Sequence, residues 1–296
     1  MENLIQPNVY SVSFFWPLPE LKYGCPICGY SEKFFASPYP SKNENFSKSI
    51  VVFCGHCGSG FVYNADQLIS GYYQKKYAET NRKDRNIEPS VYFSTDSRSK
   101  YPKLGRYFSR SQAQVRALTK YGSKFDYVLD YGSGPGYFLY LSEAKYKFAV
   151  ELDEESDKYL TFLGAQKLDP EKLPEKFFDA IVASHSIEHL TPEELNDRLI
   201  QIANALKPGG MLLIEVPQGG HSYLALTTRQ DPHTIFFTPQ GIYEAVCRTG
   251  VKILSTYARG KTEEKLNPNA VYQPPENNEF FCTRSGGLTL VCRRDD

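Results

Sequence analysis

The chain contains 296 residues, and its 34 Lys and Arg balance 34 Asp and Glu, so the formal net charge is zero. This length allows one large domain with a sizeable core and a second, smaller domain. The chain has no apolar run of about 18 residues, which argues against a transmembrane helix, and its start lacks the basic and apolar regions of a secretory signal. We therefore expect a cytoplasmic protein with no membrane partner.

Four of the cysteines form two Cys-x-x-Cys pairs early in the chain. Cys25 and Cys28 make the first pair, and Cys54 and Cys57 make the second. Four thiolates in this spacing predict a structural, tetrahedral zinc site in a small zinc-ribbon module over residues 1–65. Two disulfides are the alternative, but they are uncommon in the cytoplasm, and a redox-active Cys-x-x-Cys needs only one such pair.

The rest of the chain divides into a connector and a large domain. The connector covers residues 66–105, and the large domain covers residues 106–296. Asp66–Tyr77 places Leu and Tyr side chains near one side of a helix, which predicts a helical segment. Asn81–Gly105 is polar and contains proline, which predicts a loop.

Positive charge is concentrated next to the ribbon. Residues 66–120 carry 12 Lys and Arg against 5 Asp and Glu. Such a segment could contact phosphate, either on a nucleotide-linked sugar or on RNA. A solvated helical face beside the more acidic remainder of the chain explains the same charges. The ribbon itself is neutral, with 4 Lys and Arg against 4 Asp and Glu, so nucleic acid is the less favoured partner.

The most informative segment is Val128–Leu139. An apolar strand ends at Asp130, and glycines follow at positions 132, 134 and 136 before a helix-like apolar pattern begins. Glycine lets the backbone turn sharply and approach a ligand closely, and the start of a helix offers unpaired N–H groups. This arrangement is typical of a nucleotide-like ligand at the carboxyl end of a parallel strand. The third glycine comes one residue too early for the dinucleotide fingerprint Gly-x-Gly-x-x-Gly, so no pyrophosphate cradle is predicted.

A second buried strand, Lys147–Asp153, ends in carboxylates. A carboxylate about 20 residues beyond a glycine turn is well placed to accept hydrogen bonds from both hydroxyls of a ribose. Further strands are predicted at Phe178–Ala183 and, after a Pro-Gly-Gly turn, at Met211–Val216. Between them, Thr191–Glu194 forms a capping box at the start of a helix.

These landmarks, in this order, resemble those of class I S-adenosylmethionine-dependent methyltransferases. The resemblance covers roughly residues 105–296, and His233–Pro239 followed by a helix is similar to the subgroup with ubiquinone-pathway and sugar methyltransferases. It implies an α/β fold with a seven-stranded, mostly parallel, Rossmann-like sheet and helices on both faces. Val251–Arg259 and Gly287–Arg294 would supply strands six and seven, the last one antiparallel. Gly164–Glu175 departs from the usual pattern of the third strand.

The resemblance implies S-adenosylmethionine as the cofactor, held over the glycine bend. It favours Glu151 as the acceptor of the ribose hydroxyls, with Asp153 as the alternative. In similar enzymes with a zinc ribbon, a Tyr-rich stretch lies where Asp66–Tyr77 stands, and it could form a lid, although core packing explains its spacing equally well. The residues predicted to bind the cofactor are Asp130, Tyr131, Gly132, Ser133, Gly134, Gly136, Glu151, Leu152, Ser184 and His185.

Transfer of a methyl group to a hydroxyl needs a base, and histidine suits that role at neutral pH. The predicted bases are His189 first, then His233 and His221, because each stands near the carboxyl edge of the sheet. For each of them a hydrogen-bonded structural role is an equal alternative. Some similar enzymes hold a divalent cation in the stretch around Glu188. Here His185 replaces a carboxylate, and hard cations prefer oxygen ligands, so a catalytic cation is the less favoured alternative.

Three hypotheses about function remain at this point. The first is a methyltransferase that acts on a small-molecule hydroxyl, for example on a sugar, a nucleotide-sugar or a secondary metabolite, and the acceptor could contain phosphate. The second is an RNA or protein methyltransferase whose ribbon grips a polymer. The third is a non-catalytic cofactor-binding or docking protein, against which the intact glycines, Asp130 and Glu151 argue.

Overall fold

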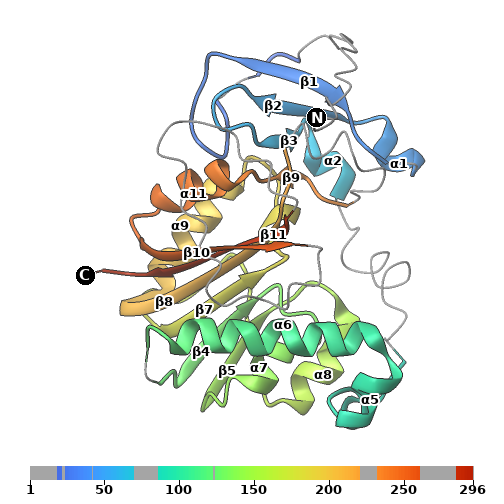
Figure 1. Ribbon diagram of the computed structural model, residues 1–296, viewed down its shortest axis with the longest axis vertical. Helices are drawn as coiled ribbons and strands as arrows, with labels where there is room; N and C mark the ends of the chain where they lie inside the picture. Colours follow the sequence, from blue (N-terminus) through green and yellow to red (C-terminus); the bar gives the residue numbers. More distant parts are fainter. Residues whose placement is uncertain are drawn as a thin grey trace, which may run out of the picture.

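The computed structural model describes residues 19–21, 24–41, 43–69, 86–122, 124–220, 232–260 and 285–295. Within these residues the strands form a small four-stranded sheet and a seven-stranded sheet, which lie one above the other in Figure 1. In the part of the chain that is described, none of the helices has both the length and the apolar character needed to cross a membrane.

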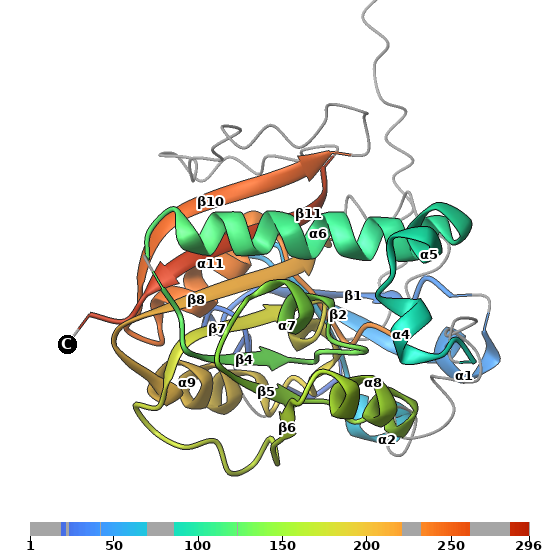
Figure 2. The same cartoon turned by 90° about the horizontal axis from the view of Figure 1, so that it is seen from below.

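The seven-stranded sheet has the order β10-β11-β8-β7-β4-β5-β6, which Figure 2 shows from top to bottom. β4 pairs in parallel with β5 and β7, and β7 pairs in parallel with β8. β11 runs antiparallel between β8 and β10. This confirms the predicted sheet with its antiparallel last strand. The strands are β4 (Tyr127–Tyr131), β5 (Tyr146–Val150), β6 (Gln166–Lys167), β7 (Phe178–Ser184), β8 (Leu206–Pro217), β10 (Lys252–Gly260) and β11 (Ser285–Arg293).

Helices cover both faces of this sheet because successive strand residues point to opposite sides. Val128 and Val182 lie in the core with α6, α7 and α8, whereas Leu129 and Ile181 lie in the core with α9 and α11. The long α6 is drawn across the front of the sheet in Figure 2. These helices are α6 (Pro102–Thr119), α7 (Tyr137–Leu141), α8 (Asp157–Phe162), α9 (Leu195–Ala205) and α11 (Pro239–Cys247), with 3₁₀ turns at η2 (Glu154–Ser156) and η3 (Ile187–His189).

The small sheet combines three strands from the N-terminal part of the chain with one strand from the large domain. Its order is β1-β2-β3-β9, and all of its pairs are antiparallel. The first three strands belong to the predicted ribbon, but β9 comes from the large domain and was not predicted. The elements of this part are β1 (Phe34–Pro38), α1 (Glu44–Ser47), β2 (Ile50–Cys54), β3 (Gly60–Val62), α2 (Ala65–Ile69) and β9 (Ile235–Phe236).

The prediction of a loop over Asn81–Gly105 is wrong for its described part. That part contains α4 (Pro89–Tyr92), α5 (Thr95–Lys100) and the start of α6. Tyr92 is fully buried, and its carbonyl accepts a hydrogen bond of 2.8 Å from the hydroxyl of Tyr137. Aromatic packing against the large domain therefore stabilises helices too short for a periodic pattern. α2 contains the first part of the predicted helix Asp66–Tyr77, and residues 70–85 lie outside the described residues.

Two local predictions for the large domain can be compared with the structure. The backbone N–H of Thr191 donates to the Glu194 carboxylate at 3.0 Å, and the Glu194 N–H donates to the Thr191 hydroxyl at 3.3 Å, so the reciprocal hydrogen bonds of the capping box form. They close the turn before α9, which begins at Leu195. The Pro-Gly-Gly segment lies inside β8 instead of before it. Gly209 has a φ of 76°, and its N–H donates to the carbonyl of Arg294 at 2.8 Å. β8 is thus paired with β7 both before and after this irregular segment.

Candidate active site

The glycine bend between β4 and α7 requires left-handed backbone conformations. The φ angles of Gly132, Gly134 and Gly136 are 79°, 51° and 87°. A Cβ atom on Gly132 would lie 2.3 Å from the Cβ atom of Ser186, whereas one on Gly134 would meet nothing within 4 Å. Gly132 is therefore needed for both its φ and its lack of a side chain, and Gly134 faces open space.

That open space is a cavity of about 600 Å³ at the carboxyl edge of the sheet. The ends of β4, β5 and β7 open into it, and α6 forms another wall. Every residue predicted to bind the cofactor lines it, with the exception of Gly136, which begins α7 as its N-cap. His189 also lines the cavity, His233 does not, and His221 lies outside the described residues.

Glu151 holds the bend and the end of β5 together. One carboxylate oxygen accepts a hydrogen bond of 2.5 Å from the N–H of Gly134, and the other accepts one of 2.8 Å from the N–H of Asp153. Asp153 has a different task, because its side chain accepts from the N–H of Glu155 at 3.0 Å and caps η2. Of the two acidic candidates for the ribose, Glu151 is thus the one in contact with the bend.

Asp130 at the end of β4 is 5% exposed. Burial, and then the charge of Glu151, raise the pKa of its carboxyl to about 8. The unfolded chain ionises near the ordinary value of 3.8, so the folded protein binds the proton more tightly, and stability is lost as the pH rises from about 4 towards 8.

We expect Asp130→Asn to stabilise the ligand-free protein at pH 7 by roughly 4 kcal/mol, because Asp130 is ionised in the unfolded chain and has to take up a proton on folding, whereas the amide does not. Thermal unfolding of both proteins between pH 5 and pH 8 measures this. The gap between the two melting temperatures should widen as the pH rises. An equal gap at every pH would show that Asp130 does not titrate in this range.

A second buried carboxylate, Glu215 on β8, organises the wall formed by α6. Gln114 donates from Nε2 to Oε2 of Glu215 at 2.9 Å and to the hydroxyl of Ser184 at 2.8 Å. Arg110 Nε lies 3.6 Å from the other oxygen of Glu215, and His185 Nε2 lies 3.8 Å from it. The roles of Gln114, Arg110 and Glu215 in this network were not predicted from the sequence. Its only signal is the spacing of Lys103, Tyr107, Arg110 and Gln114, which share one face of α6.

Histidines surround a third buried carboxylate. Glu188 is 0% exposed, and its Oε1 lies 3.4 Å from Nδ1 of His185 and 3.9 Å from Nε2 of His189. The centre of the His189 ring lies 5.0 Å from that of His233. Glu188, His189 and His233 each place one possible ligand atom within 4.8 Å of the others. The structure thus brings together two of the three predicted bases.

The pKa values of the two histidines that line the cavity shift in opposite directions. Burial lowers the pKa of His189, although Glu188 opposes the shift. Burial also acts to lower the pKa of His185, but the carboxylates of Glu188 and Glu215 outweigh it, and the pKa is raised. Burial alone would raise the pKa of Glu188, but the neighbouring histidines bring it down to about 2. At neutral pH His189 is therefore uncharged and able to accept a proton.

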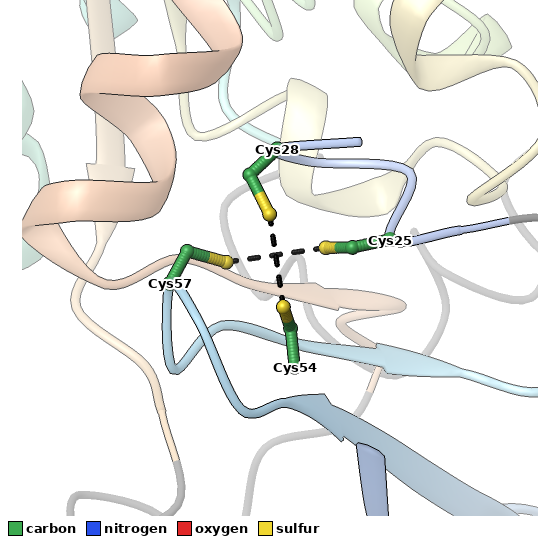
Figure 3. A group of neighbouring side chains, drawn as sticks. All are labelled: Cys25, Cys28, Cys54 and Cys57. Carbon is green, nitrogen blue, oxygen red and sulfur yellow. Dashed lines mark hydrogen bonds between the residues drawn. The ribbon is translucent and has the colours of Figure 1, made fainter. Parts of the chain in front are cut away.

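The four paired cysteines form one cluster near the ribbon's junction with α11 (Figure 3). Cys25 Sγ lies 3.9 Å from Cys57 Sγ, and Cys28 Sγ lies 3.6 Å from Cys54 Sγ. A disulfide requires sulfurs about 2.05 Å apart. A tetrahedron with metal–sulfur bonds of about 2.3 Å separates its sulfurs by about 3.8 Å. The donor set and spacing therefore fit a four-coordinate zinc ion, with no position left for a substrate.

Residues 104–256, more than half of the chain, match the family model described as "Methyltransferase domain". A search among curated proteins finds no match. Among solved structures, a possible histamine N-methyltransferase from Thermotoga maritima has a TM-score of 0.48 and 15% identity, over 66% of this chain and 96% of its own.

Two other solved structures are similar to the same extent. A didemethyltoxoflavin N1-methyltransferase from Burkholderia thailandensis, solved with S-adenosylhomocysteine, has a TM-score of 0.45 and 18% identity, over 70% of this chain and 89% of its own. A putative methyltransferase in complex with the Haloferax volcanii Trm112 activator has a TM-score of 0.45 and 16% identity, over 65% and 96%. These similarities carry no information on the acceptor. The family match shows that the chain belongs to the methyltransferase-domain family and is a class I S-adenosylmethionine-dependent methyltransferase.

Proposed function

We propose that this methyltransferase transfers the methyl group of S-adenosylmethionine to a hydroxyl of a small molecule, such as a sugar, a nucleotide-sugar or a secondary metabolite. The observation that supports this most is the composition of one cavity. It contains the glycine bend, Asp130 and Glu151, which suit the cofactor, together with the uncharged His189, which suits an acceptor hydroxyl. Lys103 and Arg110 line the same cavity and could contact an acceptor phosphate. The proposed location is the cytoplasm.

In this proposal the cofactor lies over the bend. Glu151 would exchange its contact with the Gly134 N–H for the two ribose hydroxyls, and the positive charge of the bound cofactor would favour ionisation of the buried Asp130. The remaining predicted residues of the bend would contact the cofactor through their backbone atoms. When bound, S-adenosylmethionine would supply its methyl group directly to the acceptor oxygen, with the thioether as leaving group and no covalent intermediate on the protein. Holding the two reactants in line contributes most of the catalysis, for which about 7–11 kcal/mol is available in favourable cases.

His189 takes the acceptor proton in this proposal, and Glu188 stabilises the imidazolium that forms. His189→Gln is expected to lower turnover by about 10²- to 10⁴-fold, while the affinity for S-adenosylhomocysteine stays within about twofold because the ribose site is untouched. Transfer of a labelled methyl group measures turnover, and calorimetry measures affinity. His56→Gln is the matched control, since His56 lies in the ribbon beside Glu244. Full turnover in His189→Gln would assign the base to another group.

The same residues could instead hold a divalent cation. Both carboxylate oxygens of Glu188 are buried without a hydrogen-bond partner among the described residues, which is unusual for an ionised group. Adding Mg²⁺ or Mn²⁺ to protein that has been passed over a mild chelator distinguishes the two roles. Activity that does not change supports the histidine base, and activity that depends on the added ion supports the cation.

We further propose that Cys25, Cys28, Cys54 and Cys57 hold a structural zinc ion. The alternatives for the acceptor are RNA and protein, gripped by the ribbon. Incubation of the enzyme with a labelled methyl donor and separate fractions of metabolites, RNA and protein decides among them. We expect label in the small-molecule fraction. Label in RNA or protein alone would contradict the proposal, and absence of cofactor binding would favour a non-catalytic docking role.

A further inference from the structure

The geometry points to Thr234 as a positioning residue that links the zinc ribbon to the catalytic turn η3. We propose that the metal-loaded ribbon holds η3, and with it His189, in place through Thr234 and the adjoining β9. The functional meaning of this link rests on the role proposed for His189. The link itself is a property of the fold and can be tested without an acceptor.

Thr234 is fully buried, and its contacts are to the backbone of η3 and the residue after it. Its N–H donates to the carbonyl of Glu188 at 2.9 Å. Its hydroxyl oxygen lies 2.9 Å from the carbonyl oxygen of Glu188 and 2.5 Å from that of Leu190, so its single proton is donated to one or the other. Thr234 therefore contacts the carbonyls on both sides of His189 in the chain.

The same short segment is held by the ribbon on its other side. The N–H of Val62 on β3 donates to the carbonyl of Thr234 at 2.8 Å. The hydroxyl of Tyr39, which is 3% exposed, donates to the carbonyl of His233 at 2.8 Å. β3 and β9 pair directly after these contacts. One buried residue is thus bonded to the ribbon through its carbonyl and to η3 through its N–H and hydroxyl.

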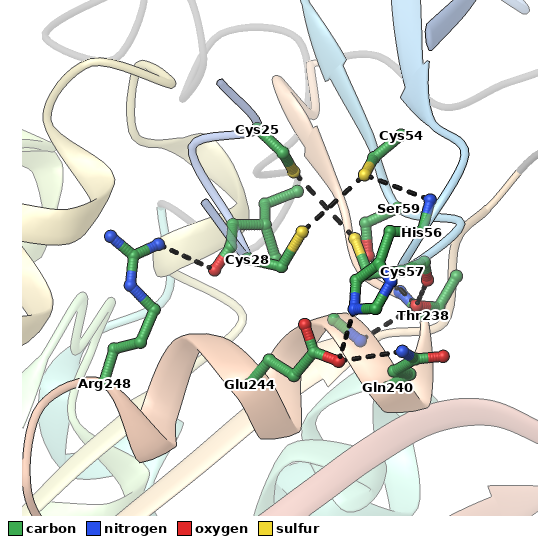
Figure 4. Close-up of polar contacts among 12 residues, drawn as sticks. Cys25, Cys28, Cys54, His56, Cys57, Ser59, Thr238, Gln240, Glu244 and Arg248 are labelled. Carbon is green, nitrogen blue, oxygen red and sulfur yellow. Dashed lines mark hydrogen bonds and ion pairs between the residues drawn. The ribbon is translucent and has the colours of Figure 1, made fainter. Parts of the chain in front are cut away.

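The far end of this segment reaches the cysteine cluster itself. The Thr238 hydroxyl donates to the carbonyl of Cys57 at 2.5 Å and accepts the N–H of Gly241, which caps α11. The N–H of Thr238 donates to the hydroxyl of Ser59 at 3.0 Å (Figure 4). A metal ion that fixes the loop of Cys54 and Cys57 would therefore hold the Thr238 end of this stretch directly, and the Thr234 end is held by Val62 on the adjoining β3.

The same contacts predict that the ribbon has little influence on the cofactor site. Asp130 lies on β4, the glycine bend follows β4, and Glu151 directly follows β5. These two strands pair with each other and with β7 and β6 in the large sheet. The hydrogen bonds through Thr234 end on residues 188 and 190. Release of the metal should therefore loosen η3 more than it disturbs the cofactor site.

Hydrogen exchange of the full, zinc-loaded chain measures this directly. In Thr234→Val, which keeps the shape but loses the hydroxyl, we expect amides of residues 187–190 to exchange about tenfold faster (about 1.4 kcal/mol), because the carbonyl of Leu190 loses its hydrogen bond to this hydroxyl. Amides of residues 127–151 should be unchanged, as should zinc content. Thr234→Ser should restore slow exchange. Thr119→Val, which loses a hydroxyl bonded to the Val115 carbonyl on α6, is the matched control.

Chelation of zinc from the wild-type chain should reproduce the same local increase at residues 187–190. If Thr234→Val does not fold, Tyr39→Phe on zinc-loaded protein tests the same link from the ribbon side. Exchange at residues 187–190 equal to that of wild type, or an equal increase over residues 127–151, would overturn the proposal. Calorimetry with S-adenosylhomocysteine on the same samples reports separately on the cofactor site, so failure of the proposed function would be seen independently.

Discussion

Replacement of Glu151 by glutamine is expected to weaken the binding of S-adenosylhomocysteine about a hundredfold. The ionised carboxylate can accept both ribose hydroxyls, and charge-assisted hydrogen bonds contribute about 1.5–3 kcal/mol each. Glutamine keeps one carbonyl oxygen, but its NH₂ group is a donor and cannot accept a hydrogen bond from the groups that donate to the carboxylate. In the free protein those donors are the N–H groups of Gly134 and Asp153. Titration calorimetry of the folded variant measures the loss.

Asp153→Asn is the matched control for this prediction. It removes the other acidic candidate and weakens the cap of η2, where Asp153 accepts from the Glu155 N–H. A lost cap costs about 1 kcal/mol of stability. We expect its affinity for the ligand to stay within about threefold of wild type. The reverse pattern, with Asp153→Asn impaired and Glu151→Gln normal, would assign the ribose to Asp153.

Loss of the zinc ion is expected to have the largest effect on stability. Structural zinc contributes about 10–16 kcal/mol to folding in isolated zinc-finger peptides. Cys54→Ser should bind less than one zinc ion per chain and melt roughly 10 °C lower, because several kcal/mol shift a domain of this size by that amount. Metal analysis and thermal unfolding of the purified variant measure the two quantities.

Cys247→Ser provides the control, since Cys247 is an exposed cysteine outside the cluster. It should keep full zinc content and an unchanged melting temperature. A wild-type chain that is folded, contains no metal and melts at the same temperature after zinc is added would contradict the assignment of the cluster. Oxidation of the four cysteines to two disulfides would be visible as loss of free thiols.

The parts of the fold that were predicted correctly have strong local signals. The β4 strand, the glycine bend and the capping box at Thr191 each depend on a few consecutive residues. The bend needs glycines at left-handed φ angles, and the box needs Thr and Glu three residues apart. The Cys-x-x-Cys pairs are likewise recognisable from their spacing in the sequence alone. Parallel strands then bring the ends of β4, β5 and β7 to one edge, so the cavity follows from the sheet order.

What could not be predicted depends on contacts between distant segments. β9 is two residues long, and it is a strand only because it pairs with the edge of β3. α4 and α5 are short, and they are held by aromatic packing of Tyr92 and Phe93 on the large domain. Glu215 and Gln114 are separated by 101 residues and meet only across α6 and β8. No local sequence pattern predicts such contacts, because the tertiary fold determines which distant residues meet.

The most direct measurement is a crystal structure of the zinc-loaded protein with S-adenosylhomocysteine. The account predicts the nucleoside in the cavity above Gly132–Gly136, with both ribose hydroxyls bonded to the carboxylate of Glu151 and the sulfur facing the side of His189. A nucleoside bound elsewhere, or one whose ribose is held by another acid while Glu151 keeps its bond to the bend, would contradict it.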